Sequence, residues 1–391
     1  MRGKLSFGIL EPAHFTNFPG YIKVGGCHRW SWRSLTCPFS EARVPHHPAV
    51  ETPLSQTFTI NNQRPSKMDE IKALDDSVGR EVQDILPATM KTFVPLLMKN
   101  KAAVHAIPPQ TEPYSSHPRQ KLDLYLPKED SKSSPILAFF YGGGLIRGDK
   151  IIPQVPEGLV YANLGSFFAS RGITTVIADY RRVNSETGGE DAVFPSGGED
   201  VSLVLKWLET YAGDSKRDVY ICGNSGGGVH ISTFLFEASF LEQRRSYISG
   251  KSAIALKGAI EQSVPLHFNN ANEYRFETLK LYYGSMEEAS HRCAYGLLKK
   301  VAKSGKSREE IGVPKMLVLL GDFDPENEIG QPTEDFVALW KKTWGGGIDF
   351  MKMEGHNHIS PPLALLSNDM KGEKWGEDVV KWIHGSSGGK L

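Results

Sequence analysis

Apolar positions along this 391-residue chain follow two spacings that alternate from one segment to the next. Short continuous apolar runs, such as residues 134–141 and 314–320, predict buried strands, whereas apolar residues three or four positions apart, as in residues 201–211, predict helices. This alternation is typical of a doubly wound, mostly parallel sheet and predicts an α/β fold. The expected strands cover residues 121–127, 134–141, 174–178, 219–222, 253–264, 314–320 and 348–353.

A serine stands where one of these strands gives way to a helix. Ser225 follows the apolar run 219–222 and has glycine two positions before it, at Gly223, and two after it, at Gly227. This G-x-S-x-G pattern is typical of a nucleophile elbow, a strained turn that needs neighbours without side chains and exposes the serine hydroxyl at the sheet edge. The turn also directs the backbone N–H of Gly226 toward negative charge that forms on the attacked carbon.

A second apolar run, residues 134–141, opens into three glycines. Backbone N–H groups in such a loop can approach a substrate closely, so we expect Gly143 and Gly144 to complete an oxyanion hole with Gly226. Two other interpretations are a flexible turn and a dinucleotide-binding loop, since the loop begins with a G-x-G pattern. The dinucleotide motif needs a third glycine at position 147, which is Arg147 here.

Candidate acids and imidazoles follow two later strands. Asp322 and Asp324 come after one apolar run, and His356 and His358 follow a stretch of alternating apolar and polar residues. The order serine, aspartate, histidine is that of α/β-hydrolases. Spacing does not choose between the acids, because residues two apart project on the same side of a strand. The histidine pair also suggests a metal site, but Ser360 stands where an H-x-H-x-D motif places its aspartate, so no metal is expected.

From about Met68 to the C-terminus the chain resembles the esterase branch of the α/β-hydrolase superfamily that is similar to hormone-sensitive lipase and carries an H-G-G-G loop. Further matching segments are residues 121–127, 178–182, 194–195 and 199–201. The chain departs from the family at Tyr141, which replaces the histidine before the glycines. The family uses that histidine to support the loop, so we expect altered hydrogen bonding around the loop and retained activity.

The resemblance implies an α/β-hydrolase fold with helical cap segments and a catalytic triad. In the family the acid precedes a proline, as Asp324 precedes Pro325, and the histidine lies three residues after a glycine, as His358 does after Gly355. His358 is then the base for Ser225, Asp324 holds the imidazole, and neither a metal nor an organic cofactor is required. The expected reaction is hydrolysis of short- to medium-chain carboxylic esters through an acyl-enzyme intermediate.

Two other functions stay open. An amidase of the arylformamidase kind would use the same triad. A non-catalytic ligand-binding protein, like the hormone receptors built on this fold, is the alternative from a different class. Those receptors generally lose a member of the triad, whereas this chain keeps a complete candidate set; fold alone does not establish function.

Composition narrows the choice of partners and compartment. A formal net charge of +0 and a pI of about 7.2 give no sign of a nucleic-acid partner or an electrostatic membrane anchor. No apolar run approaches the roughly 18 residues that span a bilayer. The 4 cysteines show neither metal-ligand spacing nor a disulfide framework, which favours a reducing compartment, the cytoplasm. We expect a small-molecule ester substrate, and a homodimer stays open.

The two ends of the chain differ from the catalytic domain expected over residues 68–391. Residues 1–67 are basic, with scattered proline and serine and little periodicity, so we expect a disordered extension. A segment for mitochondrial import, or a true start at Met68, are the alternatives. The final Lys390-Leu391 is only a weak match to the peroxisomal S-K-L signal.

Two segments inside the catalytic domain have apolar residues at helical spacing but interrupt the alternation of strands and helices. They are residues 68–117 and roughly 268–312. In the resembled family such segments cap the active site, and the aromatic side chains of residues 274–283 are expected to narrow the acyl pocket. The alternative is a set of surface helices that only stabilise the sheet.

Overall fold

The computed structural model describes residues 66–130, 132–183 and 190–386, which belong to the larger of two compact units, Asn62–Leu391. Nearly all of the extension predicted over residues 1–67 lies outside the described residues. The strands are β1 (Gln110–Pro113), β2 (Lys121–Tyr125), β3 (Ile136–Phe140), β4 (Thr174–Ala178), β5 (Arg217–Asn224), β6 (Ile254–Gln262), β7 (Lys315–Phe323) and β8 (Ile348–Asn357). The helices are α1 (Lys67–Ser77), α2 (Val82–Lys99), α3 (Lys101–Val104), α4 (Leu159–Ala169), α5 (Ser196–Ala212), α6 (Gly226–Phe236), α7 (Leu241–Ile248), α8 (Phe276–Tyr283), α9 (Met286–Arg292), α10 (Ala294–Lys303), α11 (Arg308–Ile311), α12 (Gln331–Trp344), α13 (Ser360–Ala364) and α14 (Met370–Ser386), with short turns η1 (Pro156–Gly158), η2 (Ala238–Phe240), η3 (Glu273–Arg275) and η4 (Glu326–Gly330).

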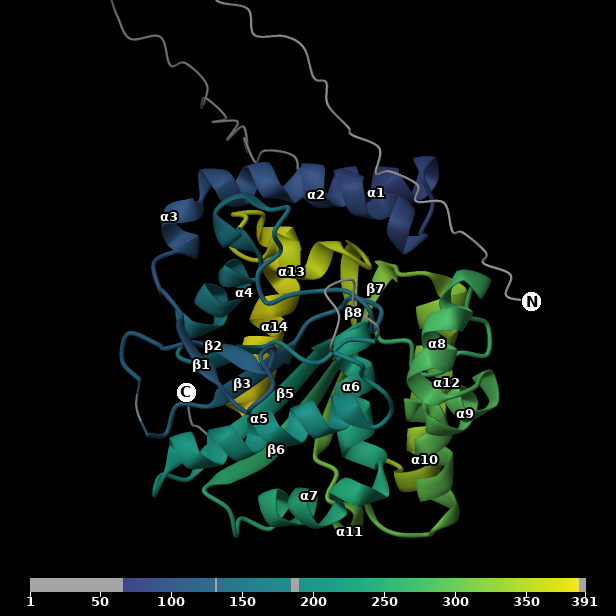
Figure 1. Cartoon of the computed structure of the whole chain (residues 1–391). Helices are drawn as coiled ribbons and strands as arrows, with labels where there is room; N and C mark the ends of the chain where they lie inside the picture. The colour runs from purple at the N-terminus through teal and green to yellow at the C-terminus, as the bar shows by residue number, and fades with distance from the viewer. Residues whose placement is uncertain (1–65, 131, 184–189, 387–391) are drawn as a thin grey trace, which may run out of the picture. The chain divides into compact units, whose positions relative to one another are not determined.

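The strands form one sheet in the order β1-β2-β4-β3-β5-β6-β7-β8 (Figure 1). β2 runs antiparallel to both of its neighbours, and all other neighbouring strands are parallel. This arrangement confirms the predicted α/β-hydrolase fold with a mostly parallel, doubly wound sheet.

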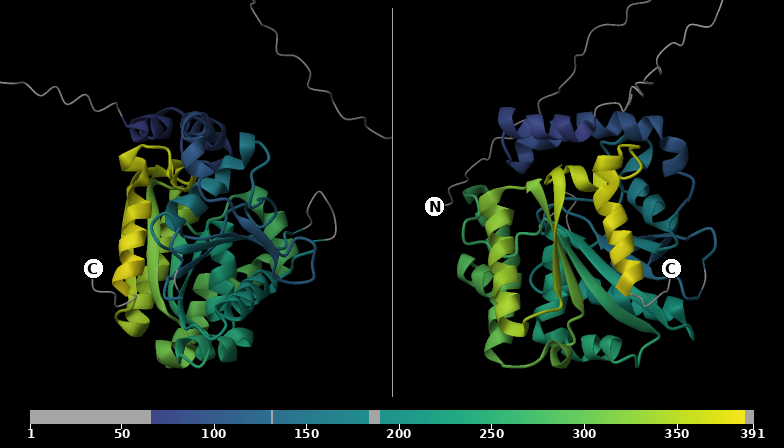
Figure 2. Two further views of the ribbon diagram at one scale, coloured as in Figure 1. Left: turned by 90° about the vertical axis from the view of Figure 1, so that its left-hand side faces the viewer. Right: turned by 180° about the vertical axis from the view of Figure 1, so that it is seen from behind.

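Helices cover both faces of the sheet, as Figure 2 shows. α4 and α14 pack on one face, whereas α5, α6 and α12 pack on the other, with α10 against α6 and α12. All five residues of β3 and of β4 are buried, which explains why their sequences are continuous apolar runs and do not alternate. In the part of the chain that the structure describes, none of the helices is both long enough and apolar enough to cross a membrane.

β1 and the end of β8 depart furthest from the sequence prediction, and the ends of the other strands shift by up to three residues. β1 was not predicted, because its four residues are all exposed and carry no apolar pattern. β8 was expected to end at Met353 but continues to Asn357. Gly355 lies inside it with φ of +74°, and its N–H donates to Asp322 Oδ2 at 2.8 Å, so a side-chain bond supports the strand where its register with β7 shifts.

The first expected cap segment forms α1 and α2, which lie across the carboxyl ends of the strands (Figure 1). Ser66, the first described residue, caps α1 by accepting from the N–H of Met68. α2 is continuous despite Pro87 and Pro95, each of which removes a backbone hydrogen bond. A buried stripe holds the helix against the body, namely Ile85, Thr89, Phe93 and Leu97.

The second expected cap segment divides into two parts. α10 packs on α6 and α12, and α11 packs on α7, so these helices cover the body of the sheet. The part around η3 instead reaches the connection between α1 and α2, where Asn272 Nδ2 donates to Glu81 Oε2 at 3.0 Å. Tyr282 and Tyr283 are buried in the core, whereas Tyr274 is half exposed.

Candidate active site

The strained serine predicted between β5 and α6 is present. Ser225 has φ of 49° and ψ of −118°, a conformation that costs a residue other than glycine about 1–3 kcal/mol. Its flanking glycines are required by space. A Cβ on Gly223 would lie 2.5 Å from the Cα of Gly228, and a Cβ on Gly227 would lie 2.0 Å from the carbonyl oxygen of Phe140. Larger residues at either position would therefore push the elbow out of the sheet.

The structure brings the predicted triad side chains together. His358 Nε2 lies 3.0 Å from Ser225 Oγ, and His358 Nδ1 lies 2.8 Å from Asp324 Oδ1. The imidazole and the carboxylate are almost fully buried. An Nδ1–H that donates to Asp324 leaves the Nε2 lone pair facing the serine hydroxyl, which is the tautomer that accepts a proton from a nucleophile.

The two candidate acids have different environments. Asp324 Oδ2 accepts hydrogen bonds from the N–H of Gly321 and from Ser263 Oγ, each at 2.7 Å, so both carboxylate oxygens are engaged. Asp322 is exposed and accepts from the N–H of Gly355. Only Asp324 contacts the imidazole. Ser263 was not foreseen from the sequence, although it directly follows the carboxyl end of β6, where functional side chains of parallel sheets gather.

A second unforeseen residue, Asn357, shapes the turn that carries His358. Asn357 Oδ1 accepts from the N–H groups of Ile359 at 3.1 Å and Ser360 at 2.9 Å, as in an Asx turn. Its Nδ2 donates to Thr89 Oγ1 on α2 at 2.9 Å. The helix that crosses the site is thus bonded to the residue beside the base. The signal for this role in the sequence is an asparagine directly before His358, the candidate base.

His356 lies in a strand, whereas we expected it in a loop. It lies within β8 and is buried, with Nδ1 2.8 Å from Ser360 Oγ and Nε2 3.0 Å from the carbonyl oxygen of Gly372. Burial lowers the pKa of His356 to about 4, so the ring is neutral near pH 7. Both ring nitrogens are bonded to groups other than the serine, so His356 does not act as the base in this arrangement.

The glycine loop after β3 lies against the elbow. A Cβ placed on Gly226 would be 3.2 Å from the amide nitrogens of Gly144 and Leu145 and 3.7 Å from that of Gly143. Among the described residues, no backbone hydrogen bond is found for the amides of Gly143, Gly144 or Gly226, which leaves these donors for a ligand. A Cβ on Gly143 would lie 1.9 Å from the carbonyl oxygen of Arg147, so only glycine fits the turn.

Tyr141 anchors the loop in place of the histidine of the resembled family. Its hydroxyl donates to Asp179 Oδ1 at 2.5 Å and accepts from Arg119 Nη2 at 2.7 Å. The hydroxyl of Tyr180 donates to the carbonyl oxygen of Tyr141 at 2.7 Å, and the two rings stack with centroids 4.8 Å apart. Burial raises the pKa of Asp179, and the adjacent guanidinium opposes that rise. The altered hydrogen bonding expected around the loop therefore takes the form of a buried ionic cluster.

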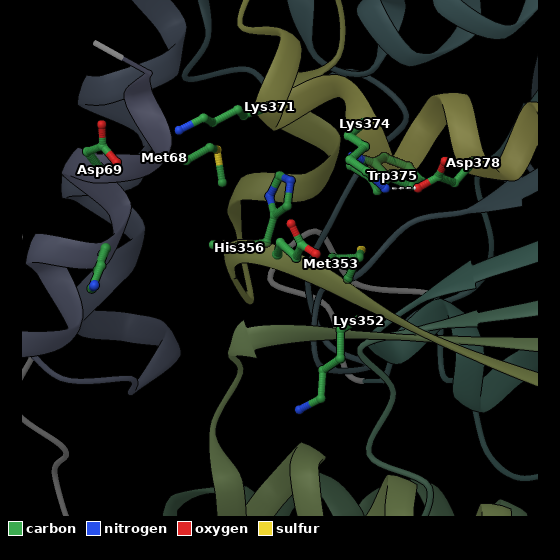
Figure 3. Close-up of a pocket in the computed structure, with 12 residues that line it drawn as sticks. Met68, Asp69, Lys352, Met353, His356, Lys371, Lys374, Trp375 and Asp378 are labelled. Atoms are coloured by element: carbon green, nitrogen blue, oxygen red, sulfur yellow. Dashed lines mark hydrogen bonds and ion pairs between the residues drawn. The ribbon is translucent and has the colours of Figure 1, made fainter.

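A hollow at the sheet edge lies beside the histidine turn (Figure 3). It is bordered by α1, β8 and α14, and Figure 3 shows Lys352 directed away from Lys371 and Lys374. Acidic side chains offset its lysines, and Lys374 pairs with Asp378. The imidazole at its floor, His356, already uses both ring nitrogens. Among the described residues, no cluster of three or more metal-ligating side chains is found. We assign no chemistry to this hollow.

Comparisons with known proteins agree with an esterase of this fold. The protein-family model BD-FAE matches residues 122–287. A probable isoprenylcysteine alpha-carbonyl methylesterase of Oryza sativa subsp. japonica is 29% identical over 280 residues, which are 69% of this chain and 62% of that protein. The isoprenylcysteine alpha-carbonyl methylesterase of Arabidopsis thaliana is 26% identical over 282 residues, 69% of this chain and 61% of that protein. The chain thus spans about six-tenths of the length of these relatives.

Solved structures with a similar fold are esterases. Esterase 2 of Thermogutta terrifontis is 18% identical with a TM-score of 0.50, and the match covers 72% of this chain and 95% of that one. Esterase B of Lactobacillus rhamnosus is 14% identical with a TM-score of 0.54, and the match covers 78% of this chain and 96% of that one. At these identities the likeness establishes the fold.

Proposed function

We propose that this chain is an esterase of the α/β-hydrolase superfamily, as the sequence motifs predicted, and that it hydrolyses carboxylic esters at Ser225. One observation carries the proposal. The hydroxyl of Ser225, the imidazole of His358 and the carboxylate of Asp324 form a continuous hydrogen-bonded chain beside a loop of unpaired amides. A nucleophile, a base that an acid orients, and an oxyanion site are the parts that acyl transfer needs.

In the first step, Ser225 Oγ attacks the ester carbonyl while His358 Nε2 takes its proton. The imidazolium that forms is stabilised by Asp324, whose other oxygen is held by Ser263 and Gly321. The carbonyl oxygen gains negative charge and accepts from the glycine-loop and α6 amides; those donors are preorganised, so they lower the barrier without reorganising during the reaction. The imidazolium then protonates the leaving alcohol, and the acyl group stays on the serine.

In the second step, water replaces the alcohol. His358 takes a proton from that water as it attacks the acyl-serine carbonyl, the same amides hold the second oxyanion, and the proton returns to Ser225 as the acid leaves. No step draws on a group beyond this chain and water.

We propose short- to medium-chain esters with a small leaving alcohol as substrates. The relatives in Oryza and Arabidopsis are named methylesterases, so a methyl ester is the scissile group to test first. α1 and α2 lie across the carboxyl ends of the strands (Figure 1), which supports a limited acyl length. Since Tyr282 and Tyr283 are buried in the core, Tyr274 and Phe276 are the aromatic side chains of this segment left to border the pocket.

The proposal is tested with purified protein and a panel of aryl and methyl esters from acetate to palmitate, beside Ser225→Ala. We expect the highest kcat/KM between acetate and hexanoate, loss of turnover in the alanine variant, and fluorophosphonate labelling of wild type alone. A rate that rises through palmitate would indicate a lipase. Turnover of N-formylkynurenine that exceeds turnover of every ester would indicate the arylformamidase reaction. Unchanged ester hydrolysis by Ser225→Ala would refute the nucleophile.

We propose further that the protein works in a reducing compartment, the cytoplasm. Cys222 and Cys293 are buried free thiols, and burial raises the pKa of both, so each is an unreactive core residue in this fold. Oligomeric state is a separate question, and sedimentation of the purified chain distinguishes a monomer from the homodimer left open above.

A further inference from the structure

Arg275 in η3 is held in a fixed orientation beside the glycine loop. Its Nε donates to Glu328 Oε1 at 2.5 Å and its Nη2 donates to Glu328 Oε2 at 2.8 Å, a bidentate pair that sets the plane of the guanidinium. Glu328 belongs to η4, the turn that follows the acid of the triad, and is nearly buried. One edge of the guanidinium is therefore tied to the segment that carries Asp324.

The same carboxylate also fixes the backbone before the arginine. Glu328 Oε1 accepts from the N–H of Asn272 at 3.1 Å, and Asn272 Nδ2 donates in turn to Glu81. Burial by itself lowers the pKa of Arg275, but the hydrogen bonds and charge of Glu328 outweigh this and raise that pKa above its usual value. The side chain is thus a permanent cation with little rotational freedom left to lose on binding a ligand.

The opposite edge of the guanidinium faces the oxyanion loop. Arg275 Nη1 lies 3.7 Å from the position that a Cβ on Gly144 would occupy. Within the described residues no hydrogen bond is found for Nη1, although the side chain is only 29% exposed. An NH2 group of a fixed cation therefore lies beside Gly144 of the expected oxyanion loop, and among the described residues it has no hydrogen-bond acceptor.

We infer that Arg275 selects substrates, binding a carboxylate carried by the ester close to its scissile bond. A guanidinium that is already oriented binds a carboxylate at small entropic cost, and its Nη1 edge lies farther from Glu328 than the edge that forms the pair. A ligand bound beside Gly144 would thus have a guanidinium N–H group within reach. This inference rests on the proposed esterase function and narrows its substrate class to half-esters of short dicarboxylic acids and similar anionic esters.

The test compares two esters that differ only in their far end, methyl pentanoate and monomethyl glutarate, with acid release followed by pH-stat titration. In Arg275→Gln, we expect the ratio of kcat/KM for the glutarate to kcat/KM for the pentanoate to fall about tenfold, the worth of one charge-assisted hydrogen bond. In Glu328→Gln, which removes a negative charge but keeps acceptors for Arg275, the same ratio should rise. Arg245→Gln on α7, at the opposite end of the sheet from α1 and α2 (Figure 1), is the matched control and should change neither value.

Each outcome separates this inference from the proposed function. Equal losses on both esters in Arg275→Gln would show that the arginine only supports the loop and would overturn the inference. A wild type that cleaves the pentanoate but not the glutarate would overturn it as well. If wild type and Ser225→Ala show the same background on both esters and on the aryl panel, the esterase proposal itself fails. Salt provides a second readout, since a selectivity that depends on charge should weaken as ionic strength rises.

Discussion

The elbow after β5 and the glycine loop after β3 are both glycine-rich turns at the carboxyl ends of neighbouring parallel strands, yet different forces hold them. The elbow is held by steric constraint, because the backbones of Phe140 and Gly228 leave no room for side chains at Gly227 and Gly223. The loop is held by a buried ionic cluster in which Tyr141 links Asp179 and Arg119. The elbow depends on close backbone packing, whereas the loop also depends on side chains far away in the sequence.

This difference distinguishes the residues that react from the residues that hold the oxyanion loop in place. Changes at the elbow and its hydrogen-bonded partners should remove turnover, because they delete reacting groups. Changes in the cluster behind the loop should instead loosen the amides that receive the oxyanion, which weakens catalysis in a graded way.

The largest effect is expected at the base that serves the elbow. His358→Ala should lower kcat by about 10⁴-fold or more, because an unassisted serine hydroxyl is a poor nucleophile at neutral pH. Fluorophosphonate labelling of Ser225 should disappear with it. His356→Gln is the control two residues away, and it should keep most of kcat while lowering the melting temperature. A folded but inactive His356 variant beside an active His358 variant would reverse the assignment.

The acids give the next largest contrast. Asp324→Asn should lower kcat by about 10³–10⁴-fold, because an amide in that place favours the wrong tautomer of the imidazole. Asp322→Asn removes only a charge on an exposed strand end, keeps an acceptor for the Gly355 amide and should leave kcat within about twofold. Steady-state kinetics of the two variants decide the matter, and similar losses in both would mean that the acids share the role.

The glycine loop should respond in a graded manner. Tyr141→Phe keeps the ring stack but leaves Asp179 and Arg119 without the bridging hydroxyl, so kcat should fall about tenfold with KM nearly unchanged. Tyr247→Phe, which loses a hydrogen bond to Gln243 on α7, is a control that should lose stability only. Equal kcat in wild type and Tyr141→Phe would show that the loop does not depend on the cluster.

Two buried histidines, His356 and His230, predict how the free energy of unfolding varies with pH. His356 has a pKa of about 4 in the folded protein and near 6.5 when unfolded, so between these values only the unfolded chain binds the proton. The free energy of unfolding should therefore fall as pH drops below about 6.5, by up to about 1.4 kcal/mol per pH unit. His356→Gln should flatten this slope in urea titrations, although His230, whose pKa burial lowers to about 3, keeps part of it. Parallel slopes would contradict the assignment of His356 as a buried neutral ring.

The smallest effect concerns the residues that precede α1. Deletion of residues 1–65 should leave the melting temperature and kcat/KM unchanged, because the extension predicted over residues 1–67 lacks a periodic apolar face. Ser66→Ala should cost about 1 kcal/mol, because it removes the cap of α1. Ser77→Ala at the exposed far end of α1 is the control. An insoluble deletion variant would show that the extension packs on the body.

Local patterns predicted the fold and the elbow, and contacts between distant residues account for what they missed. The G-x-S-x-G motif lies within one turn, so the sequence could identify Ser225. Asp324 and His358 could be chosen only through the family resemblance, because Asp322 and His356 fit the same spacing. Ser263 could not be recognised, since its partner lies 61 positions away.

Contacts between residues that lie far apart in the sequence were also out of reach of sequence patterns. Tyr141 reaches Asp179 across 38 positions and Asn357 reaches Thr89 across 268, and no periodicity encodes such pairs. The end of β8 was misplaced for a related reason. A glycine normally signals a strand end, but Gly355 remains in the ladder because a side chain from β7 replaces its missing backbone partner.

Ser66 and Asp369 join the first described helix to the segment before the last, across 303 positions, with oxygen pairs at 2.8 and 2.9 Å. During synthesis on the ribosome, α2 and α3 can pack on α4 early, but the contacts of α2 with α13 and of Ser66 with Asp369 form only after the last quarter of the chain has been made. The triad can form only when β8 is complete, so the remaining cover over the site and its base arrive almost together. Nascent chains that lack α13 therefore leave part of the apolar side of α2 uncovered, a natural target for chaperones while the protein is being made.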